Sequence, residues 1–232
     1  MATAEAEQQR AASLLDAQNK AAQMFAEIER TLIKPGVSDK TLSDQIHQLG
    51  TDMYGVRTHW HKRIVRSGPN TLRPHDDNPP DRIIQPDDLL VVDLGPVFEE
   101  WEADFGRTYV FGEDAGKLRM RDALEPIWRT VHAYFHATPD ITGAQLFARA
   151  QEEVKKAGFE WGNSDIAGHL IGHFPHERIP RDKIALYITE QNDAPMRSAG
   201  KDGLQRHWIL EVYLQDEKHE YQAFFEQLLT TQ

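Results

Sequence analysis

The sequence predicts an α+β protein, because two helical blocks alternate with strands that come in hairpins. Apolar residues recur at helical spacing over residues 4–33 and 114–137, whereas residues 88–94 form a short apolar run typical of a buried strand. The 232 residues, 40% of them hydrophobic, suit one domain with a real core, and no internal repeat or clear linker divides them. We therefore expect a single domain over residues 1–232 that begins with the helix 4–33.

Capping residues and helix breakers predict where the helices begin and end. Thr3 and Ser38 can accept a hydrogen bond from the first turn of a helix through their hydroxyls, and Thr142 opens another helix. Pro126 lies inside a long helix and should kink it, because proline lacks a backbone N–H. The expected helices are residues 4–33, 38–54, 114–137 and 142–158.

The expected strands are short runs rich in β-branched and aromatic residues. Between the first two strands, residues 67–86 are rich in proline, asparagine, aspartate and glycine and show no periodicity. A structureless stretch of this length inside a compact domain is usually functional or disordered. The expected strands are residues 62–66, 88–94, 97–98, 108–111, 184–188, 208–214 and 221–229.

Composition narrows the class of partner. A formal net charge of −11 argues against nucleic acid, whose phosphates require a basic face. We interpret the basic stretch Arg57–Arg66 as a charged strand that resists edge pairing rather than a polyanion site. No apolar run is long enough to cross a membrane, and the N-terminus lacks the pattern of a signal peptide, so we expect a cytoplasmic protein. Without cysteine, any metal must be bound by His, Asp or Glu.

Two aspartates flank a predicted hairpin. Asp93 ends the apolar strand LLVVD, and Asp104 follows eleven residues later. A turn near Glu99–Glu100 would bring the two acids together, where one would take a proton or a metal would lie between them. The alternative is that Asp104 pairs with Arg107 or caps a turn. From these residues alone the two interpretations are equally supported.

Two glutamates lie in later apolar strands, Glu211 in WILEVYL and Glu226 in AFFEQLL. A lone acid in a strand usually faces solvent, and alternation allows that for either residue. Four acids on strand-like segments together with a histidine cluster nevertheless favour a metal site. Oxygen-rich sites with one imidazole suit Mn, Fe, Co or Zn.

The histidine cluster is the segment IAGHLIGHFPHERI, with His169, His173 and His176. His169 and His173 have the spacing of the zinc motif HExxH, but Leu170 stands where that motif has glutamate. The glycines at 168 and 172 also argue against a helix, so we expect a strand or turn in which the backbone can approach a ligand.

These motifs resemble the methionine aminopeptidase / aminopeptidase P / creatinase superfamily over roughly residues 40–230. In that family two aspartates stand eleven residues apart, and a Gly-His-x-x-Gly segment is followed by a second histidine seven residues after the first. The resemblance implies the pita-bread fold, a curved, antiparallel-rich sheet covered by helices. The metal ligands that it implies are Asp93, Asp104, His169, Glu211 and Glu226.

The resemblance also implies catalytic roles. His176 would donate a hydrogen bond to the developing oxyanion, and Glu211 would accept a proton from the nucleophilic water. His75, eighteen residues before Asp93, would contact the substrate. His173 has no counterpart role.

The implied activity is that of an aminopeptidase-type metallopeptidase with two divalent metal ions (Mn, Co, Fe or Zn), acting on the first peptide bond of a short peptide. The alternatives are a non-peptide C–N hydrolase or lyase on the same fold, and a pseudoenzyme that serves as a binding module; an intact ligand set argues against the metal-free and pseudoenzyme forms. No proline follows Glu211, and no arginine stands in YQAFFE. We also expect these 232 residues to lack a counterpart of the large N-terminal domain of aminopeptidases P. Xaa-Pro specificity therefore stays open, and a homodimer is compatible with this interpretation.

Overall fold

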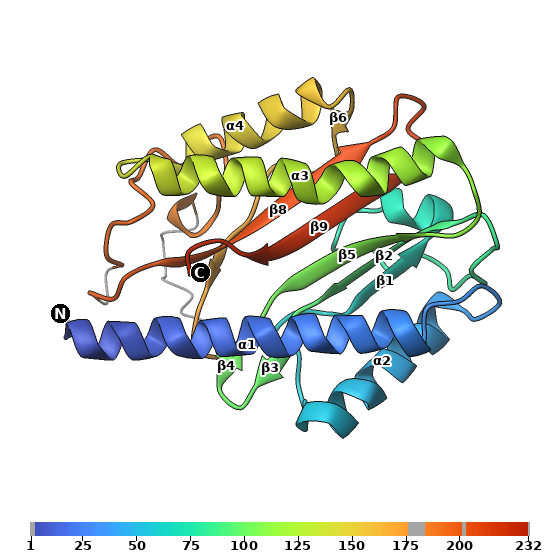
Figure 1. Ribbon diagram of the computed structural model, residues 1–232, viewed down its shortest axis with the longest axis horizontal. Helices are drawn as coiled ribbons and strands as arrows, with labels where there is room; N and C mark the ends of the chain where they lie inside the picture. Colours follow the sequence, from blue (N-terminus) through green and yellow to red (C-terminus); the bar gives the residue numbers. More distant parts are fainter. Residues whose placement is uncertain (1–2, 176–183, 201–202, 232) are drawn as a thin grey trace.

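The protein is described by a computed structural model for residues 3–175, 184–200 and 203–231. Four long helices and a set of mostly short strands make up this part of the chain (Figure 1). The helices are α1 (Ala4–Thr31), α2 (Asp39–Tyr54), α3 (Ala115–Ala137) and α4 (Gly143–Lys156), with 3₁₀ turns at η1 (Gly68–Leu72) and η2 (Ile184–Leu186). The strands are β1 (Ile64–Ser67), β2 (Leu89–Leu94), β3 (Val97–Phe98), β4 (Trp101–Glu102), β5 (Phe105–Val110), β6 (Glu160–Trp161), β7 (Leu170–Ile171), β8 (His207–Gln215) and β9 (Gln222–Leu228).

The main sheet is antiparallel throughout its described part. Its strand order is β1-β2-β5-β9-β8-β6, and β7 pairs with β8. Strands β3 and β4 form a separate hairpin that connects β2 to β5. This mixture of helices and antiparallel strands confirms the α+β prediction.

One face of the sheet is covered by helices. In Figure 1, α3 and α4 lie along β8 and β9, and α1 and α2 lie along the side of β1, β2 and β5. Leu90 and Val92 of β2 belong to the same buried cluster as Met24 of α1, whereas Leu210 of β8 packs with Val131 of α3. Burying each such side chain stabilises the fold by about 1.5–3 kcal/mol.

The residues that alternate with these point to the opposite face, because successive side chains of a strand lie on opposite sides of the sheet. Val91 and Asp93 of β2 line a cavity there, and so do Glu211 of β8 and Glu226 of β9. The helices therefore bury one face of the sheet, and the acidic residues gather on the other face.

The predicted caps are present. Ser38 Oγ accepts a hydrogen bond from Thr41 N at 3.1 Å, and Thr3 Oγ1 accepts one from Ala6 N at 3.2 Å. At α4, Thr142 forms a reciprocal capping box with Gln145. These local signals explain why the helix boundaries lie within two residues of the predicted ones.

Several strand predictions were inexact or wrong. The segment expected as a strand at 184–188 begins with the 3₁₀ turn η2, and the first strand lies at Ile64–Ser67 rather than 62–66. The strand expected at 108–111 begins three residues earlier, at Phe105, and β4 and β6 were not foreseen. β7 lies in the segment GHLIG, for which a strand or turn was expected. Two-residue strands carry too little periodicity to be recognised without their partners.

None of the described helices combines the length and the apolar character needed to span a bilayer.

Candidate metal centre

The strand register places three carboxylates in one row across four neighbouring strands. Asp93 of β2 is paired with Gly106 of β5, which is paired with Glu226 of β9. Glu226 is in turn paired with Glu211 of β8. Directly opposed residues point to the same face of an antiparallel sheet, so these three acids converge although up to 133 positions separate them in the sequence (226 minus 93). Gly106 lies between Asp93 and Glu226 in this row, and a Cβ there would lie 2.3 Å from the ring of Phe224 and 3.2 Å from Cβ of Glu226.

Asp104 joins the row through the β3–β4 hairpin. The hairpin turns at Glu99, whose φ of 58° lies in the left-handed region, close to the predicted turn. Asp104 immediately precedes β5 and is only 2% exposed. The alternative pairing with Arg107 was wrong, because the Arg107 guanidinium donates to Gln227 Oε1 at 2.6 Å and packs over the ring of Phe225.

His169 reaches the row from the strand-like segment GHLIG. Gly168 has a φ of 133°, and a Cβ there would lie 2.0 Å from the carbonyl oxygen of Ile209, so only glycine allows this close approach to β8. His169 Nε2 lies 3.0 Å from Asp104 Oδ2 and 3.6 Å from Glu211 Oε1. Its Nδ1 lies 2.8 Å from the carbonyl oxygen of Leu170.

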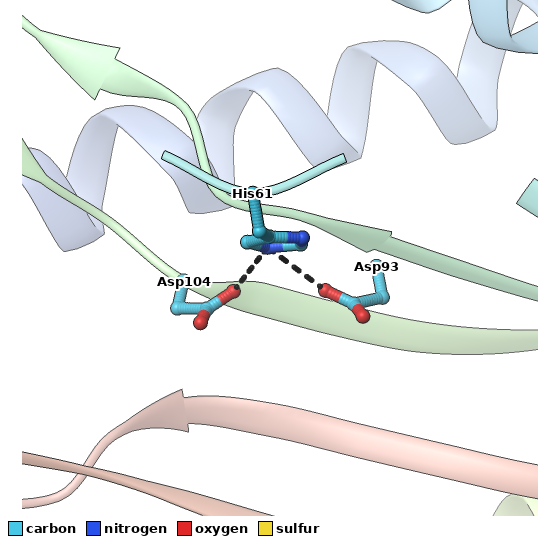
Figure 2. A group of neighbouring side chains, drawn as sticks. All are labelled: His61, Asp93 and Asp104. Atoms are coloured by element: carbon cyan, nitrogen blue, oxygen red, sulfur yellow. Dashed lines mark hydrogen bonds and ion pairs between the residues drawn. The ribbon is translucent and has the colours of Figure 1, made fainter. Parts of the chain in front are cut away.

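A second imidazole, which the sequence analysis missed, lies on the other side of Asp104. His61 Nε2 is 3.2 Å from Asp104 Oδ1 and 3.5 Å from Asp93 Oδ1 (Figure 2). In the sequence this histidine stands within the basic stretch Arg57–Arg66. No local signal marks it, because it approaches Asp93 only through the pairing of Ile64 with Asp93 in the sheet.

The interpretation of Arg57–Arg66 as a charged strand was only partly right. Only its last three residues belong to β1, and Arg66 is 6% exposed rather than solvated. Its guanidinium donates to the carbonyl oxygens of Pro74, His75 and Asp77 at 3.0, 3.1 and 2.7 Å. Arg66 therefore holds the loop that carries His75.

Burial and mutual repulsion make the acids unequal. Burial raises the pKa of Glu211 against the opposing charge of His169, and burial together with the neighbouring acids raises that of Glu226. Burial also raises the pKa of Asp93 to about 7, against the opposing charge of His61. Burial would also raise the pKa of Asp104, but His61 and His169 outweigh it and lower that pKa.

The imidazoles respond in the opposite sense. Burial alone would lower the pKa of His61, but the charges of Asp93 and Asp104 raise it to about 9. Burial would likewise lower the pKa of His169, but its hydrogen bond to Asp104 and the charges of Asp104 and Glu211 together raise that pKa to about 9. The site therefore favours positive charge at its centre.

The donor set fits divalent metal ions. Atoms of His61, Asp93 and Asp104 lie within 4.8 Å of one another, and so do atoms of Asp104, His169 and Glu226. Asp93 Oδ1 is buried without a hydrogen-bond partner in the described structure. Among the described residues, no lysine or arginine forms an ion pair with these carboxylates. Oxygen and imidazole donors of this kind suit Mn, Fe, Co or Zn.

A cavity of about 400 Å³ opens onto the acids. His75 lines it, with its ring 5.6 Å from that of His61 and its Nδ1 3.3 Å from Asp76 Oδ1. Tyr213 also lines it, and its hydroxyl donates to Glu211 Oε2 at 2.7 Å. The sequence analysis did not single out Tyr213, which is placed on the acid face by its position two residues after Glu211 on the same strand.

The other two histidines of the cluster are placed differently. His173 has a side chain 54% exposed, lies 3.4 Å from Glu100 and packs edge-on against Trp101, outside the cavity lining. His176 lies outside the described residues.

The fold and this cluster of acids and imidazoles define a metallohydrolase-like centre. The chain belongs to metallopeptidase family M24, whose model matches residues 12–199. The resemblance found in the sequence is thereby confirmed at the level of the family.

Curated proteins with similar sequences include peptidases. A Xaa-Pro dipeptidase of Lactobacillus helveticus is 30% identical over 146 residues, which are 62% of this chain and 39% of that protein. A Xaa-Pro dipeptidase of Pyrococcus furiosus is 34% identical over 112 residues, 47% of this chain and 30% of that protein. The chain thus spans less than half the length of the curated relatives that it matches.

Solved structures show the same fold. The dipeptidase PepE of Mycobacterium ulcerans superposes with a TM-score of 0.71 at 26% identity, over 94% of this chain and 55% of that one. A methionine aminopeptidase of Rickettsia prowazekii gives a TM-score of 0.72 at 17% identity, over 95% of this chain and 92% of that one. The pita-bread prediction is confirmed by these likenesses.

Proposed function

We propose that this protein is a metal-dependent, aminopeptidase-type hydrolase that cleaves the N-terminal peptide bond of short peptides. The observation that carries the proposal is the convergence of four buried carboxylates and an imidazole on the wall of one cavity. Asp104 lies at its centre, with Oδ2 directed at His169. Membership of family M24 and the dipeptidases among its relatives support the same class of reaction.

We propose five residues as ligands of two divalent ions, with Mn, Co, Fe or Zn as candidates. Asp93 would hold one ion, and His169 and Glu211 would hold the other, while Asp104 and Glu226 would contribute to holding both. Bound ions would polarise the substrate carbonyl and lower the pKa of a water molecule toward neutrality.

The chain's own groups would handle the proton. Glu211 Oε1 faces the centre, 3.6 Å from His169, while its Oε2 accepts the hydrogen bond from Tyr213. Tyr213 would therefore hold Glu211 in one orientation, with Oε1 on the side of the centre. A base of this kind must lie within hydrogen-bond reach of the proton that it takes, and Glu211 would meet that condition for a water bound at the centre.

Substrate contacts would come from the cavity rim. His75 stands at the rim on the loop that Arg66 orders, so its imidazole can contact the amide of a bound peptide. His176 would stabilise the developing oxyanion; it remains a prediction of the resemblance. The acidic wall would attract the free amino end of a peptide. A cavity of about 400 Å³ favours short peptides, and the Xaa-Pro dipeptidases among the relatives make Xaa-Pro dipeptides the first substrates to test.

The test separates metal binding from peptidase activity. Metal-free protein should be loaded with Mn, Co, Fe or Zn, its metal content measured by elemental analysis, and a library of dipeptides and tripeptides then assayed for release of the first residue. We expect about two ions per chain and turnover that Glu211→Gln abolishes. The matched control is Glu160→Gln, an exposed acid far from the centre whose side chain lies 3.4 Å from His219.

Two results would overturn the proposal. Absence of bound metal after loading would contradict the metal centre and point to a binding module. Full metal content with no hydrolysis of any peptide in the library would contradict peptidase activity and point to another C–N bond as the substrate.

A further inference from the structure

We propose that His61 is a sixth protein ligand of the metal centre, so that each of the two ions is bound by one imidazole. The inference rests on the proposed metal centre and extends it, because the resemblance to family M24 implies only His169 as an imidazole ligand. His61 comes from a different part of the chain, the segment that leads into the edge strand β1.

The distances around His61 are those of ligands that share an ion. In a tetrahedral or octahedral site with bonds of about 2.1 Å, neighbouring ligand atoms lie about 3.0 to 3.4 Å apart. His61 Nε2 lies 3.2 Å from Asp104 Oδ1 and 3.5 Å from Asp93 Oδ1. His169 Nε2 has the same relation to the other oxygen, Asp104 Oδ2, at 3.0 Å. The two halves of the site are therefore alike, with Asp104 between them.

Hydrogen bonding orients the two rings in the same way. Nδ1 of His61 lies 2.7 Å from the carbonyl oxygen of Lys62, and Nδ1 of His169 lies 2.8 Å from that of Leu170. Because a carbonyl oxygen only accepts, each Nδ1 carries the proton, and the neutral ring has its lone pair on Nε2. A histidine whose outer nitrogen donates to a backbone carbonyl is the usual arrangement of a metal ligand.

Neighbouring groups hold His61 in place. The indole of Trp60 donates to the carbonyl oxygen of Ala103 at 3.2 Å and contacts both imidazoles, with ring centres 4.5 Å from His61 and 4.9 Å from His169. The side chain of His61 is 8% exposed. In Figure 2 the Nε2 atom of His61 faces oxygens of Asp93 and Asp104. A metal cation between them would be bound by the lone pair of Nε2 and by both carboxylates.

The sixth ligand would change which metal the centre prefers. Without His61, the ion next to Asp93 has only oxygen ligands from the protein, a set that suits Mn or Mg. An imidazole shifts the preference toward Co, Fe and Zn. His61→Gln should therefore weaken Zn binding at one position much more than Mn binding.

The first measurement is calorimetric titration of metal-free protein with Zn. We expect two ions per chain in the unaltered protein and a loss of at least about a hundredfold in affinity for one ion in His61→Gln, the upper end of the effect of second-shell changes. The control is His173→Gln, an exposed histidine outside the cavity lining, which should bind like the unaltered protein. Equal binding of both ions by His61→Gln would overturn the inference.

A second measurement counts the imidazole ligands directly, first in the unaltered protein and then in single variants. The unaltered protein, labelled with ¹⁵N-histidine and loaded with ¹¹³Cd, should show two imidazole nitrogens coupled to cadmium. His169→Gln and His61→Gln should each remove one coupling, and His75→Gln should remove neither. Two bound ions with a single coupled imidazole would refute His61 as a ligand and leave the proposed function standing. No bound ion at all would refute both.

Discussion

Replacing Asp104 with asparagine tests the centre most directly, because the substitution keeps the shape of the side chain and removes its charge. Asp104 is 2% exposed, and its two oxygens lie 3.2 Å from His61 and 3.0 Å from His169. One residue thus contacts both halves of the site. Asp104→Asn should therefore weaken the binding of both ions, since an amide has only one oxygen and no negative charge to offer them.

The magnitude can be expressed as thermal stabilisation by metal. A ligand at a hundred times its dissociation constant stabilises the folded state by about 2.7 kcal/mol, so two ions contribute about 5 kcal/mol. In a chain of this size each kcal/mol raises the Tm by about 2–4 °C. The unaltered protein should thus gain about 10–20 °C on metal addition, and Asp104→Asn should gain almost none.

The assay is calorimetric unfolding of each protein with chelator and with added metal, combined with elemental analysis. The readout is the difference in Tm between the two conditions. A change in the intrinsic stability of the variant affects both conditions and therefore largely cancels in this difference. Glu100→Gln is the matched control, because this exposed acid precedes Asp104 by four residues and its carboxylate lies 3.4 Å from His173 at the surface. An unaltered increment in Asp104→Asn would refute the bridging role.

Three further predictions follow from the same site. His169→Ala should lose bound metal, whereas His173→Ala should keep both metal and rate; the reverse result by elemental analysis would mean that the cluster is a different site. His176→Ala should lower kcat and kcat/KM about a hundredfold with metal content unchanged, and a normal kcat would contradict its role as oxyanion donor. The metal-free protein should lose stability as pH rises from about 6.5 to 9, because the pKa of His61 and His169 rises from 6.5 to about 9 on folding; their stabilisation is complete below the unfolded pKa and is lost through the folded one. Asp93, with a pKa raised to about 7, acts in the same sense at lower pH. Added metal should reverse the trend, because its ligands must be deprotonated, and a Tm of metal-free protein that increases toward pH 9 would contradict these signs.

Local patterns in the sequence were enough for the helices, whereas the set of candidate ligands came from the resemblance to a family. A cap such as Ser38 acts on the turn that follows it, and an apolar stripe such as that of residues 4–33 needs only the helical repeat to be recognised. The two aspartates could be paired because a short hairpin joins them, and the strand nature of GHLIG followed from its glycines. Such features depend on residues that are close together in the chain.

The roles of His61, Arg66 and Tyr213 depended on the tertiary structure. His61 lies in a segment that looks merely basic, and it becomes part of the centre only because β1 pairs with β2 at Ile64 and Asp93. Arg66 looked like a solvated charge, but the loop that folds over it supplies the carbonyl oxygens that bind it.

The tertiary structure also decided whether Asp104 joins Asp93 or pairs with Arg107. Its neighbour in sequence, Arg107, points to the helix-covered face beside Phe225, whereas Asp104 faces imidazoles 43 and 65 positions away. A strand alternates its side chains between two faces, so residues three apart end on opposite sides of the sheet. Which side holds the helices and which holds the metal site is decided by how distant strands pair, and that information is not contained in any short stretch of the chain.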